Sequence, residues 1–481
     1  MAHEPWAHEL WTWDELLKAV PFAVADGKPS QVISGFSIDT RTLEPGNVFV
    51  ALKDQRDGHD FVTTAFTAGA AAAIVSDSYQ RKPGDRALLR ATDPLKVLEE
   101  IGRAARTRLT PQARVIAVTG SAGKTGTKEM LRACLSAVAP GKVHASEKSY
   151  NNHWGVPLTL ARMPADTQFA VFEIGMNHAG EIRPLTQMVH PHAAIITTVE
   201  AVHLEHFESV EAIADAKAEI FEGLVSGGAA IIKRDSPHFD RLRVKAQAQS
   251  AKIVSFGLEQ GADVHAEEIT LGEDGSDITA GVGGRPVNYT IAIPGRHIAE
   301  NSLAVLAALD AVGAPLEQAL AALAKLPPTP GRGARTTLSV PDGEVLLIDE
   351  SYNANPASMQ AALATLGNIS RAKYPRRVAV LGDMLELGRD APFLHRSLFE
   401  AVDGAGVDKL FACGPHMKGL YDTLPAAMQG GYEPAASALA PLVLQSLQAG
   451  DAIIVKGSNG TRLGPLVDAI KARFDKGMPS R

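Results

Sequence analysis

The seven residues Thr119-Gly120-Ser121-Ala122-Gly123-Lys124-Thr125 decide the fold of the middle of this chain. They follow an apolar, β-branched run at 115–118 and precede a helix-like stretch at 128–138. A glycine-rich turn between a strand and a helix aims several backbone N–H groups and the positive end of the helix dipole at one point. In such a turn Lys124 reaches the β- and γ-phosphates, and the Thr125 hydroxyl ligates Mg²⁺. The sequence therefore predicts a site for ATP or GTP.

The loop is shorter than a full Walker A motif, whose first glycine would fall at Val118. A chance cluster is the alternative in a chain with 43 glycines. The order of the residues at a strand-to-helix junction favours the nucleotide site. A P-loop kinase or GTPase switch is disfavoured, because it needs the full motif and a hydrophobic run that ends in Asp.

Length and composition predict a globular protein of about three domains, because the chain has 481 residues, 45% hydrophobic and 21% charged. A net charge of -7 and a pI near 6.1 disfavour broad binding to nucleic acid or to anionic membranes. Cys134 and Cys413 are far apart, which indicates no disulfide framework and fits a reducing compartment. The sequence has neither the pattern of a signal peptide nor a long uncharged apolar run. We therefore expect a cytoplasmic protein without a membrane span.

Strand and helix signals alternate along the chain, and two breaks divide it. We expect a compact α/β module over 1–110, a central domain over 111–328 and a C-terminal domain over 329–481. The prolines at 327–331 mark the second break, since consecutive prolines fit neither a helix nor a central strand. The central domain is expected to hold a mostly parallel, doubly wound sheet, with a β-rich excursion at 263–293. The third region also looks Rossmann-like, but it has no Gly-x-Gly-x-x-Gly fingerprint, which disfavours a dinucleotide cofactor.

The N-terminal region carries two local signals. Thr12 and Glu15 have the spacing of a capping box that opens a helix. Trp6, Trp11 and Trp13 stand beside this helix start and favour core or interface packing over a binding face.

Two polar residues follow strand-like runs near the phosphate loop. Glu173 ends the run 169–173 among apolar neighbours, which favours a metal ligand at a strand end over an ordinary surface glutamate. His203 lies between a strand and a helix. It either contacts a metal or phosphate, or has a structural role in a loop.

Two more candidates lie on expected helices. Lys217 stands among alanines, and the residues alone favour a solvated helix lysine. The alternative is a lysine with a lowered pKa, whose neutral amine reacts with CO₂ to give a carbamate. Asn301 lies near the start of a helix, where it either holds a ligand or stays within the helix.

Polar residues also gather at the start of the third region. Arg332 and Arg335 beside the linker suit a phosphate clamp between domains. The segment 349–356 has more polar residues than a turn needs. For the turn at 456–460, a ligand role and an ordinary left-handed turn remain equally open.

Taken together, these segments resemble the Mur ligases, the ATP-dependent amide-forming enzymes of peptidoglycan precursor synthesis. The resemblance covers nearly the whole chain. Besides the phosphate loop it rests on Tyr150-Asn151-Asn152, Phe172-Glu173-Ile174-Gly175-Met176, His203-Leu204-Glu205, Ala216-Lys217, and Gly295-Arg296-His297 with Asn301. Segments 351–356 and 381–388 are most similar to the branch that adds D-alanyl-D-alanine, and the tetrapeptide Asp-Asn-Pro-Arg of another branch does not occur.

The resemblance implies a UDP-substrate domain, a central ATPase and a C-terminal Rossmann-like ligase domain. It implies that ATP phosphorylates the terminal carboxylate of UDP-MurNAc-tripeptide, and that D-Ala-D-Ala attacks the acyl phosphate. Another Mur ligase or a folylpolyglutamate synthetase would keep this chemistry and change the amine. An inactive nucleotide-binding module is disfavoured because Lys124, Thr125, Glu173 and His203 are all present. A monomer is expected.

The resemblance also implies roles for single residues. Those that hold the phosphates are Gly120, Ser121, Ala122, Gly123 and Lys124, and those that hold Mg²⁺ are Thr125, Glu173 and His203. Lys217 matches a lysine that is carbamylated in some relatives. Further contacts to ATP are implied for Asn301, Arg332 and Asp349.

Substrate contacts are implied in two further places. Residues at the nucleotide-sugar end are Asp39, Thr40, Arg41, Asn151 and Asn152, and residues that meet the dipeptide or ATP are Asn353 and Asn355. Two positions depart from the family pattern: Glu350 stands where an aspartate is usual, and Asn459 where an arginine is usual. Because Arg332 lies beyond the proline linker, reaching ATP requires domain closure.

Overall fold

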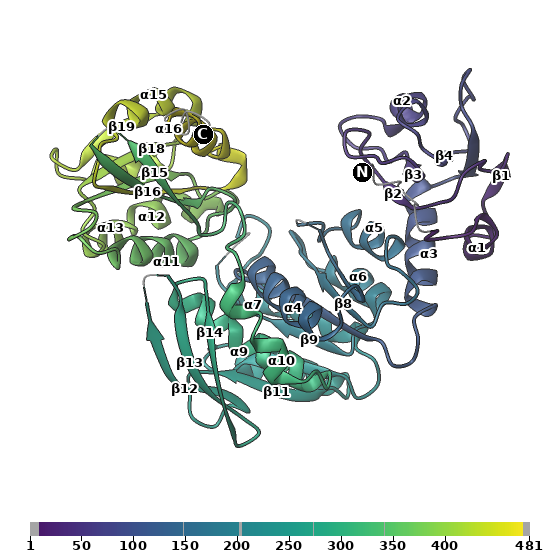
Figure 1. The fold of residues 1–481 in the computed structure, drawn as a ribbon, viewed down its shortest axis with the longest axis horizontal. Helices are drawn as coiled ribbons and strands as arrows, with labels where there is room; N and C mark the ends of the chain where they lie inside the picture. The colour runs from purple at the N-terminus through teal and green to yellow at the C-terminus, as the bar shows by residue number, and fades with distance from the viewer. Residues whose placement is uncertain (1–8, 148, 202–203, 273, 341, 475–481) are drawn as a thin grey trace, which may run out of the picture.

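The computed structural model describes residues 9–147, 149–201, 204–272, 274–340 and 342–474. The chain folds around three separate sheets, arranged in sequence order from the N-terminal to the C-terminal unit (Figure 1). The α/β fold class expected from the sequence is confirmed. Within the described residues we find no helix with the length and apolarity that a membrane span needs.

The N-terminal unit has a five-stranded sheet in the order β1-β5-β4-β3-β2, parallel except for the edge strand β1. Its elements are α1 (Trp13–Ala19), β1 (Val24–Asp26), β2 (Gly35–Ser37), β3 (Asn47–Val50), α2 (Val62–Thr67), β4 (Ala72–Ser76), β5 (Ala87–Ala91) and α3 (Pro94–Thr107). The expected capping box opens α1, since Thr12 and Glu15 bond each other's backbone N–H groups.

The central unit has a nine-stranded sheet in the order β14-β13-β12-β11-β10-β9-β6-β8-β7. Its strands are β6 (Arg114–Thr119), β7 (Val143–Ala145), β8 (Phe169–Glu173), β9 (Ala193–Ile196), β10 (Ala229–Lys233), β11 (Lys252–Gly257), β12 (Val264–Leu271), β13 (Ser276–Val282) and β14 (Arg285–Ile291). Its helices are α4 (Lys124–Val138), α5 (Gly155–Ala161), α6 (Ile182–Val189), α7 (Val210–Ala218), α8 (Phe239–Ala248), α9 (Arg296–Ala311) and α10 (Leu316–Leu320). The expected β-rich excursion is the antiparallel run β12-β13-β14 on a parallel sheet.

The C-terminal unit has a six-stranded sheet in the order β15-β16-β20-β17-β18-β19, parallel except for the edge strand β15. Its strands are β15 (Ala334–Val340), β16 (Gly343–Glu350), β17 (Arg376–Gly382), β18 (Lys409–Cys413), β19 (Gln429–Glu433) and β20 (Asp451–Lys456). Its helices are α11 (Pro356–Gly367), α12 (Ala391–Arg396), α13 (Phe399–Gly404), α14 (Met417–Tyr421), α15 (Ala436–Ser446) and α16 (Gly464–Phe474).

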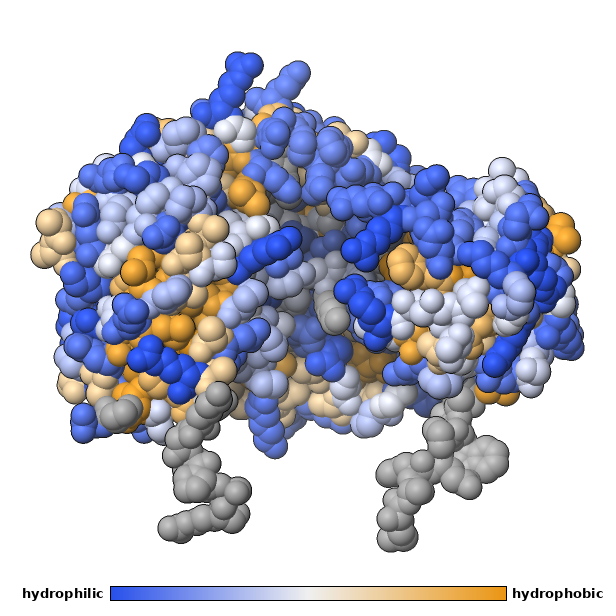
Figure 2. Space-filling view, turned by 90° about the horizontal axis from the view of Figure 1, so that it is seen from above, coloured by the Kyte–Doolittle hydropathy of each residue, from blue (hydrophilic) through white to orange (hydrophobic). Residues whose placement is uncertain are grey.

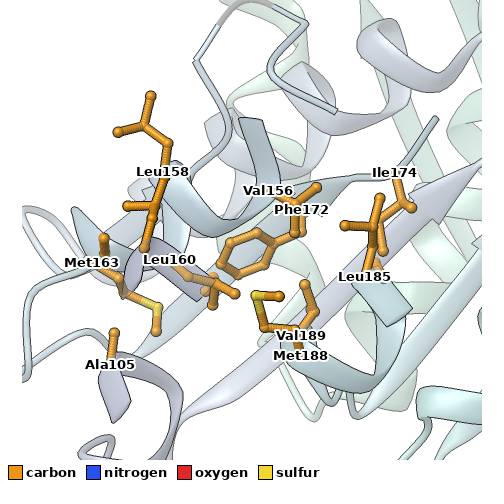
Figure 3. Packing of buried hydrophobic residues seen from close by; sticks show 14 of the residues in the cluster. Ala105, Val156, Leu158, Leu160, Met163, Phe172, Ile174, Leu185, Met188 and Val189 are labelled. Atoms are coloured by element: carbon orange, nitrogen blue, oxygen red, sulfur yellow. The ribbon is translucent and has the colours of Figure 1, made fainter. Parts of the chain in front are cut away.

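Strand β6 shows how the central sheet is held. Successive side chains of a strand point to opposite faces, and both faces here are covered by helices. Val115 and Ala117 pack into one core cluster, and Ile116 and Val118 pack into the other. Figure 3 shows part of the first cluster, where Phe172 of β8 is surrounded by side chains of α5 and α6. These packed faces fix the strand ends from which the site is built.

The three units meet at two seams of different kinds. One hydrophobic cluster runs without interruption from Trp11 through α3 to α5 and β8, so it joins the N-terminal unit to the central one. The C-terminal sheet has its own two clusters, which contain residues of that unit only. We call the first the apolar seam and the contact between the central and C-terminal units the polar seam.

Candidate active site

A cavity of about 660 Å³ lies at the polar seam. Its central wall is made by the phosphate loop, the ends of β8 and β9 and the start of α9. The opposite wall is made by the linker, the end of β16, the start of α11 and the loops after β17 and β20. Seen from above, the molecule is hollowed in its middle and mainly hydrophilic residues surround the hollow (Figure 2). The carboxyl ends of parallel strands are the usual ligand edge of such sheets.

The phosphate loop is held in shape by the strand beside it. Gly120 has φ +149°, and a Cβ there would lie 1.9 Å from Thr197 Oγ1. The Ser121 N–H donates to Thr198 O at 2.8 Å, and its hydroxyl donates to Glu200 O at 3.1 Å. Helix α4 begins at Lys124, four residues earlier than the helix-like stretch of the sequence, so its first N–H groups lie at the loop itself. The loop is thus preformed for an anion.

Thr125 and Glu173 form a buried pair of oxygen ligands. Thr125 Oγ1 donates to Glu173 Oε2 at 2.7 Å, and Asn151 Nδ2 donates to Glu173 Oε1 at 2.8 Å. Because Glu173 is only 1% exposed, an ordinary surface glutamate is excluded. Hydroxyl and carboxylate oxygens are ligands that Mg²⁺ prefers, so the pair fits this ion. His203 lies outside the described residues, and within these no three His, Cys, Asp or Glu side chains form a metal cluster.

Lys217 lies on α7 and is 2% exposed, so the interpretation as a solvated helix lysine is wrong. Helix α7 turns this position inward among buried alanines, a face that charge alone does not reveal. Burial, and then the charge of Lys124, lower the pKa of Lys217 well below its usual value. Burial also lowers the pKa of Lys124, with Glu173 opposing the shift and Arg332 adding to it. Burial therefore favours the neutral form of the Lys217 amine.

Asn301 lies on α9 and contacts the phosphate loop. A Cβ on Gly123, which has φ +81°, would lie 2.5 Å from Asn301 Nδ2. Beside it, Glu300 accepts hydrogen bonds from Lys233 at 2.8 Å and from Arg296 at 3.2 Å. The apolar side chains that line the cavity near these charges are Ile293, Ile298 and Leu326. A wall with apolar area and fixed polar groups suits a nucleobase.

Arg332 crosses the polar seam from the linker. Its guanidinium carbon lies 4.5 Å from the ring centroid of Tyr352, and its Nη2 lies 3.4 Å from Ser149 Oγ of the central unit. A guanidinium stacked on a ring keeps its N–H donors free to turn toward an anion. The side chain is thus directed into the cavity that Lys124 lines on the other side.

Like Gly120, and unlike the other expected ATP contacts, Asp349 does not line this cavity. Its carboxylate accepts the N–H of Gly331 at 3.1 Å, the N–H of Ser351 at 3.1 Å and the hydroxyl of Ser351 at 2.6 Å. Its neighbour Glu350 does line the cavity and accepts from Lys456 Nζ at 3.2 Å. Asp349 therefore fixes the turn from which Arg332 extends.

The expected substrate residues lie in three places. Asp39, Thr40 and Arg41 follow β2 of the N-terminal unit, away from the cavity lining, and Arg41 pairs with Asp39 at 2.6 Å. Asn152 Oδ1 accepts the Gly155 N–H at 2.9 Å at the start of α5. In the cavity wall, the side chain of Asn355 caps α11 and that of Asn353 bonds the next N–H group.

Several residues of the cavity wall were not found from the sequence. Thr197, Thr198 and Glu200 follow β9, which pairs directly with β6. The rule that ligands bind beyond the carboxyl ends of adjacent strands could have indicated them. Tyr352 and Lys456 lie in segments that the sequence singled out, but their directions are set by packing in the C-terminal unit.

Comparison with known proteins places this geometry in context. Residues 118–309 match the family described as the Mur ligase middle domain, and residues 335–459 match the Mur ligase, glutamate ligase domain. The chain is 36% identical to the UDP-N-acetylmuramoyl-tripeptide–D-alanyl-D-alanine ligase of Escherichia coli, over 91% of this chain and 94% of that protein. It is 33% identical to the enzyme of the same name from Rickettsia prowazekii, over 89% and 93%. The crystal structure of MurF from Acinetobacter baumannii superposes with a TM-score of 0.82 at 29% identity, covering 96% and 99%.

Proposed function

Because the chain belongs to the Mur ligase family, we propose that it joins D-alanyl-D-alanine to UDP-MurNAc-tripeptide with cleavage of ATP. The product is UDP-MurNAc-pentapeptide, a precursor of peptidoglycan, together with ADP and phosphate. Relatives named for this reaction cover about nine tenths of the chain, which favours this amine over that of another Mur ligase or a folylpolyglutamate synthetase.

The observation that carries the proposal is the single cavity with a phosphate loop on one wall and Arg332 on the other. In the first step a carboxylate oxygen of the peptide attacks the γ-phosphorus of ATP, and ADP leaves. In the second step the amine of D-Ala-D-Ala attacks the carbonyl carbon, a proton is lost from nitrogen, and phosphate leaves. Both steps bring anions together, so cationic groups on both walls are needed.

The residues of the central wall divide this work. Lys124 and the N–H groups of residues 120–125 bind the phosphates, and the Asn301 side chain contacts ATP beside Gly123. Thr125 and Glu173, with His203, would hold Mg²⁺, which when bound offsets the charge of the phosphates. Asn151 orients Glu173 by its 2.8 Å hydrogen bond.

The C-terminal wall brings the second set of groups. Arg332 contacts the phosphates when the polar seam closes, and Tyr352 supports its guanidinium. Asp349 contributes to ATP binding through the turn at Gly331. Asn353 and Asn355 meet the dipeptide or ATP at the start of α11.

We assign the nucleotide-sugar end of the substrate to the N-terminal unit. Asp39, Thr40 and Arg41 bind that end, and Asn151 and Asn152 guide the peptide toward Glu173. The three ranges 1–110, 111–328 and 329–481 then act as the UDP-substrate, ATPase and ligase domains. We also propose that the chain works as a monomer in the cytoplasm, where its buried, free Cys134 and Cys413 stay reduced.

Lys217 is proposed to carry a carbamate. Burial lowers the pKa of its amine, and the neutral form that this favours can attack CO₂ and lose a proton, which gives an anionic group near Lys124. NMR with ¹³C-bicarbonate tests this: we expect a carbamate resonance in the parent and none in Lys217→Arg. The same spectrum for both proteins would contradict the modification.

The function is tested by phosphate release with a panel of amines. With ATP, Mg²⁺ and UDP-MurNAc-tripeptide, we expect phosphate release and UDP-MurNAc-pentapeptide in the presence of D-Ala-D-Ala, and no ligation with D-glutamate or L-glutamate. Ligation of glutamate instead of the dipeptide would assign the chain to another branch of the family. Mass spectrometry of the product separates the outcomes.

A further inference from the structure

The loop that follows β17, residues 383–388, connects the C-terminal sheet to the rim of the cavity. Its buried side chains, Met384 and Leu387, pack into the C-terminal unit, whereas Leu385 and Glu386 are exposed. Glu386 lines the cavity, and its carbonyl oxygen lies 3.5 Å from the N–H of Glu205 in the central unit. The tip of this loop therefore forms part of the polar seam.

The loop tip has an unfavourable backbone conformation. Glu386 has φ +62°, a left-handed value that residues with a Cβ adopt rarely. Such a conformation persists only where the surrounding structure fixes it. The contacts on either side of the tip therefore decide where Glu386 stands.

Two hydrogen bonds, one of them buried, fix the backbone just before the tip. The Met384 N–H donates to His395 Nε2 at 2.9 Å, and the Leu385 N–H donates to Ser458 Oγ at 3.0 Å. Ser458 belongs to the turn after β20, and its own N–H donates to Asp383 O at 3.1 Å. The Asp383 carboxylate accepts the N–H groups of His416 at 3.3 Å and of Met417 at 2.7 Å, and one of its oxygens lies 3.8 Å from His395 Nε2.

The bonds of His395 require one tautomer. Its Nδ1 lies 2.6 Å from Ala391 O, which only accepts, so Nδ1 carries the hydrogen. Nε2 is then the lone-pair acceptor that the Met384 N–H needs. The ring is fully buried, and burial lowers the pKa of His395, with Asp383 opposing and His416 adding to the shift. The neutral ring thus serves as a fixed acceptor.

We propose that His395 is a positioning residue for the ligation: by accepting the Met384 N–H it holds Glu386 at the cavity rim against the central unit. The expected change in kcat rests on the proposed function, whereas the expected change in hydrogen exchange of residues 383–388 does not. His395 touches no substrate. It acts only through the 383–388 backbone.

Two substitutions of His395 test the hydrogen bonds of its two ring nitrogens separately. In His395→Gln the amide oxygen can take the place of Nε2 and accept from Met384. In His395→Asn the shorter amide can take the place of Nδ1 and leaves the Met384 N–H without its acceptor. We expect kcat to fall about tenfold in His395→Asn, with KM for ATP unchanged, and to stay within about threefold of the parent in His395→Gln.

A variant at a second position and a matched control show whether a change in kcat comes from the loop or from a general loss of stability. Ser458→Ala removes the other bond to the loop and is expected to lower kcat in the same way without changing KM for ATP. Ser397→Ala, next to α12, removes a hydroxyl that bonds only Leu394 O, and serves as the matched control. Melting temperatures are measured for all four variants.

Amide hydrogen exchange by mass spectrometry gives the readout that does not need activity. We expect faster exchange at residues 383–388 in His395→Asn than in His395→Gln, at equal melting temperature. Equal exchange and equal kcat in the two variants would overturn the proposal. A parent enzyme that fails to ligate D-Ala-D-Ala but shows the exchange difference would refute the proposed function and leave only the structural part of the proposal, that His395 holds the 383–388 backbone.

Discussion

The two seams of this molecule use opposite chemistry. At the apolar seam, Trp11 Nε1 donates to Ala161 O at 2.8 Å, and the guanidinium of Arg108 lies 3.7 Å from the Trp11 ring centroid. Helices α3 and α5 approach so closely that a Cβ on Gly102 would lie 3.2 Å from Leu160 Cβ. At the polar seam, Arg332 reaches Ser149 at 3.4 Å across a cavity lined by charged and amide side chains.

This difference decides which units move together. Burying a continuous apolar cluster stabilises the joined state in the way a domain core does, and opening it would expose that area to water. Charged groups around a cavity lose little when the cavity opens, because water replaces the contacts. We therefore infer that the N-terminal and central units form one body, and that closure occurs at the polar seam.

The largest expected effect belongs to the polar seam. Lys124→Ala removes the only side-chain cation of the phosphate loop, and we expect kcat/KM to fall by at least about 10³-fold, with the free energy of unfolding nearly unchanged. Lys245→Ala is the matched control, because this lysine is exposed and pairs with Asp215 on α8 and α7. Phosphate release and denaturant unfolding measure the two quantities. Full activity of Lys124→Ala would remove the phosphate loop from the mechanism.

At the apolar seam, a substitution should change stability and leave the chemistry intact. Trp11→Ala empties a buried ring site that joins two units, and we expect a loss of about 3 kcal/mol in the free energy of unfolding. Trp11→Phe keeps a ring and loses only the Nε1–H bond, with an expected loss of about 1 kcal/mol. The kcat per folded molecule should stay the same in both. A large loss of kcat in folded Trp11→Ala would show that the two seams are not independent.

The sequence predicted the apolar seam less fully than the polar one. Trp11 and Trp13 were expected to pack in a core or an interface, and both are buried. The partner, however, is the carbonyl of Ala161 about 150 residues away, and no local pattern specifies such a pairing. Thr125 and Glu173 were found because phosphate chemistry demands a fixed order of residue types beside strands.

What the sequence did not specify about Lys217 and Asp349 has a similar physical origin. Lys217 was read as solvated because a lysine is usually exposed, but its place on α7 is set by the buried alanines around it. The expected contact of Asp349 with ATP stays a prediction, and its oxygens accept hydrogen bonds from Gly331 and Ser351. In both cases tertiary packing fixed a direction that residue type and spacing leave open.

Two histidines, one beside each seam, are expected to differ in how strongly they make the free energy of unfolding depend on pH. Burial lowers the pKa of His144, whose Nε2 lies 2.8 Å from Thr159 O on α5 beside the apolar seam, to about 4. An unfolded histidine titrates near 6.5, so between pH 6.5 and 4 the unfolded chain binds more protons and the free energy of unfolding falls as pH is lowered. His297, at the polar seam, also has a pKa lowered by burial; Glu350 and Glu300 oppose the shift, and Lys456 adds to it.

We expect His144→Gln to remove a pH dependence of about 2 kcal/mol between pH 7 and pH 5, because glutamine keeps a donor for Thr159 and does not titrate. His297→Gln should remove a smaller pH dependence of the free energy of unfolding. Denaturant unfolding at both pH values measures the difference. The opposite order of the two variants would contradict the inferred role of the carboxylates.

A smaller effect is expected where Arg332 crosses the polar seam. Arg332→Lys keeps the charge but loses the planar stacking on Tyr352, so we expect KM for ATP to rise about tenfold. The free energy of unfolding should change by less than about 0.5 kcal/mol. Arg389→Lys, at an exposed position of the C-terminal unit, is the control. An unchanged KM would show that Arg332 does not reach the phosphates.

The smallest expected effect is a movement of the C-terminal unit relative to the central unit, at the polar seam only. Cysteines introduced at Phe22, Val244 and Leu442 place labels on the exposed surface of the N-terminal, central and C-terminal units. The native Cys134 and Cys413 are both buried, which limits their labelling. With a non-hydrolysable ATP analogue and Mg²⁺, we expect energy transfer to change for the 244–442 pair and to stay constant for the 22–244 pair. A shared core resists relative motion of two units, and a water-filled cavity does not. Equal changes in the two pairs would therefore mean that the continuous apolar cluster does not hold the N-terminal and central units as one body.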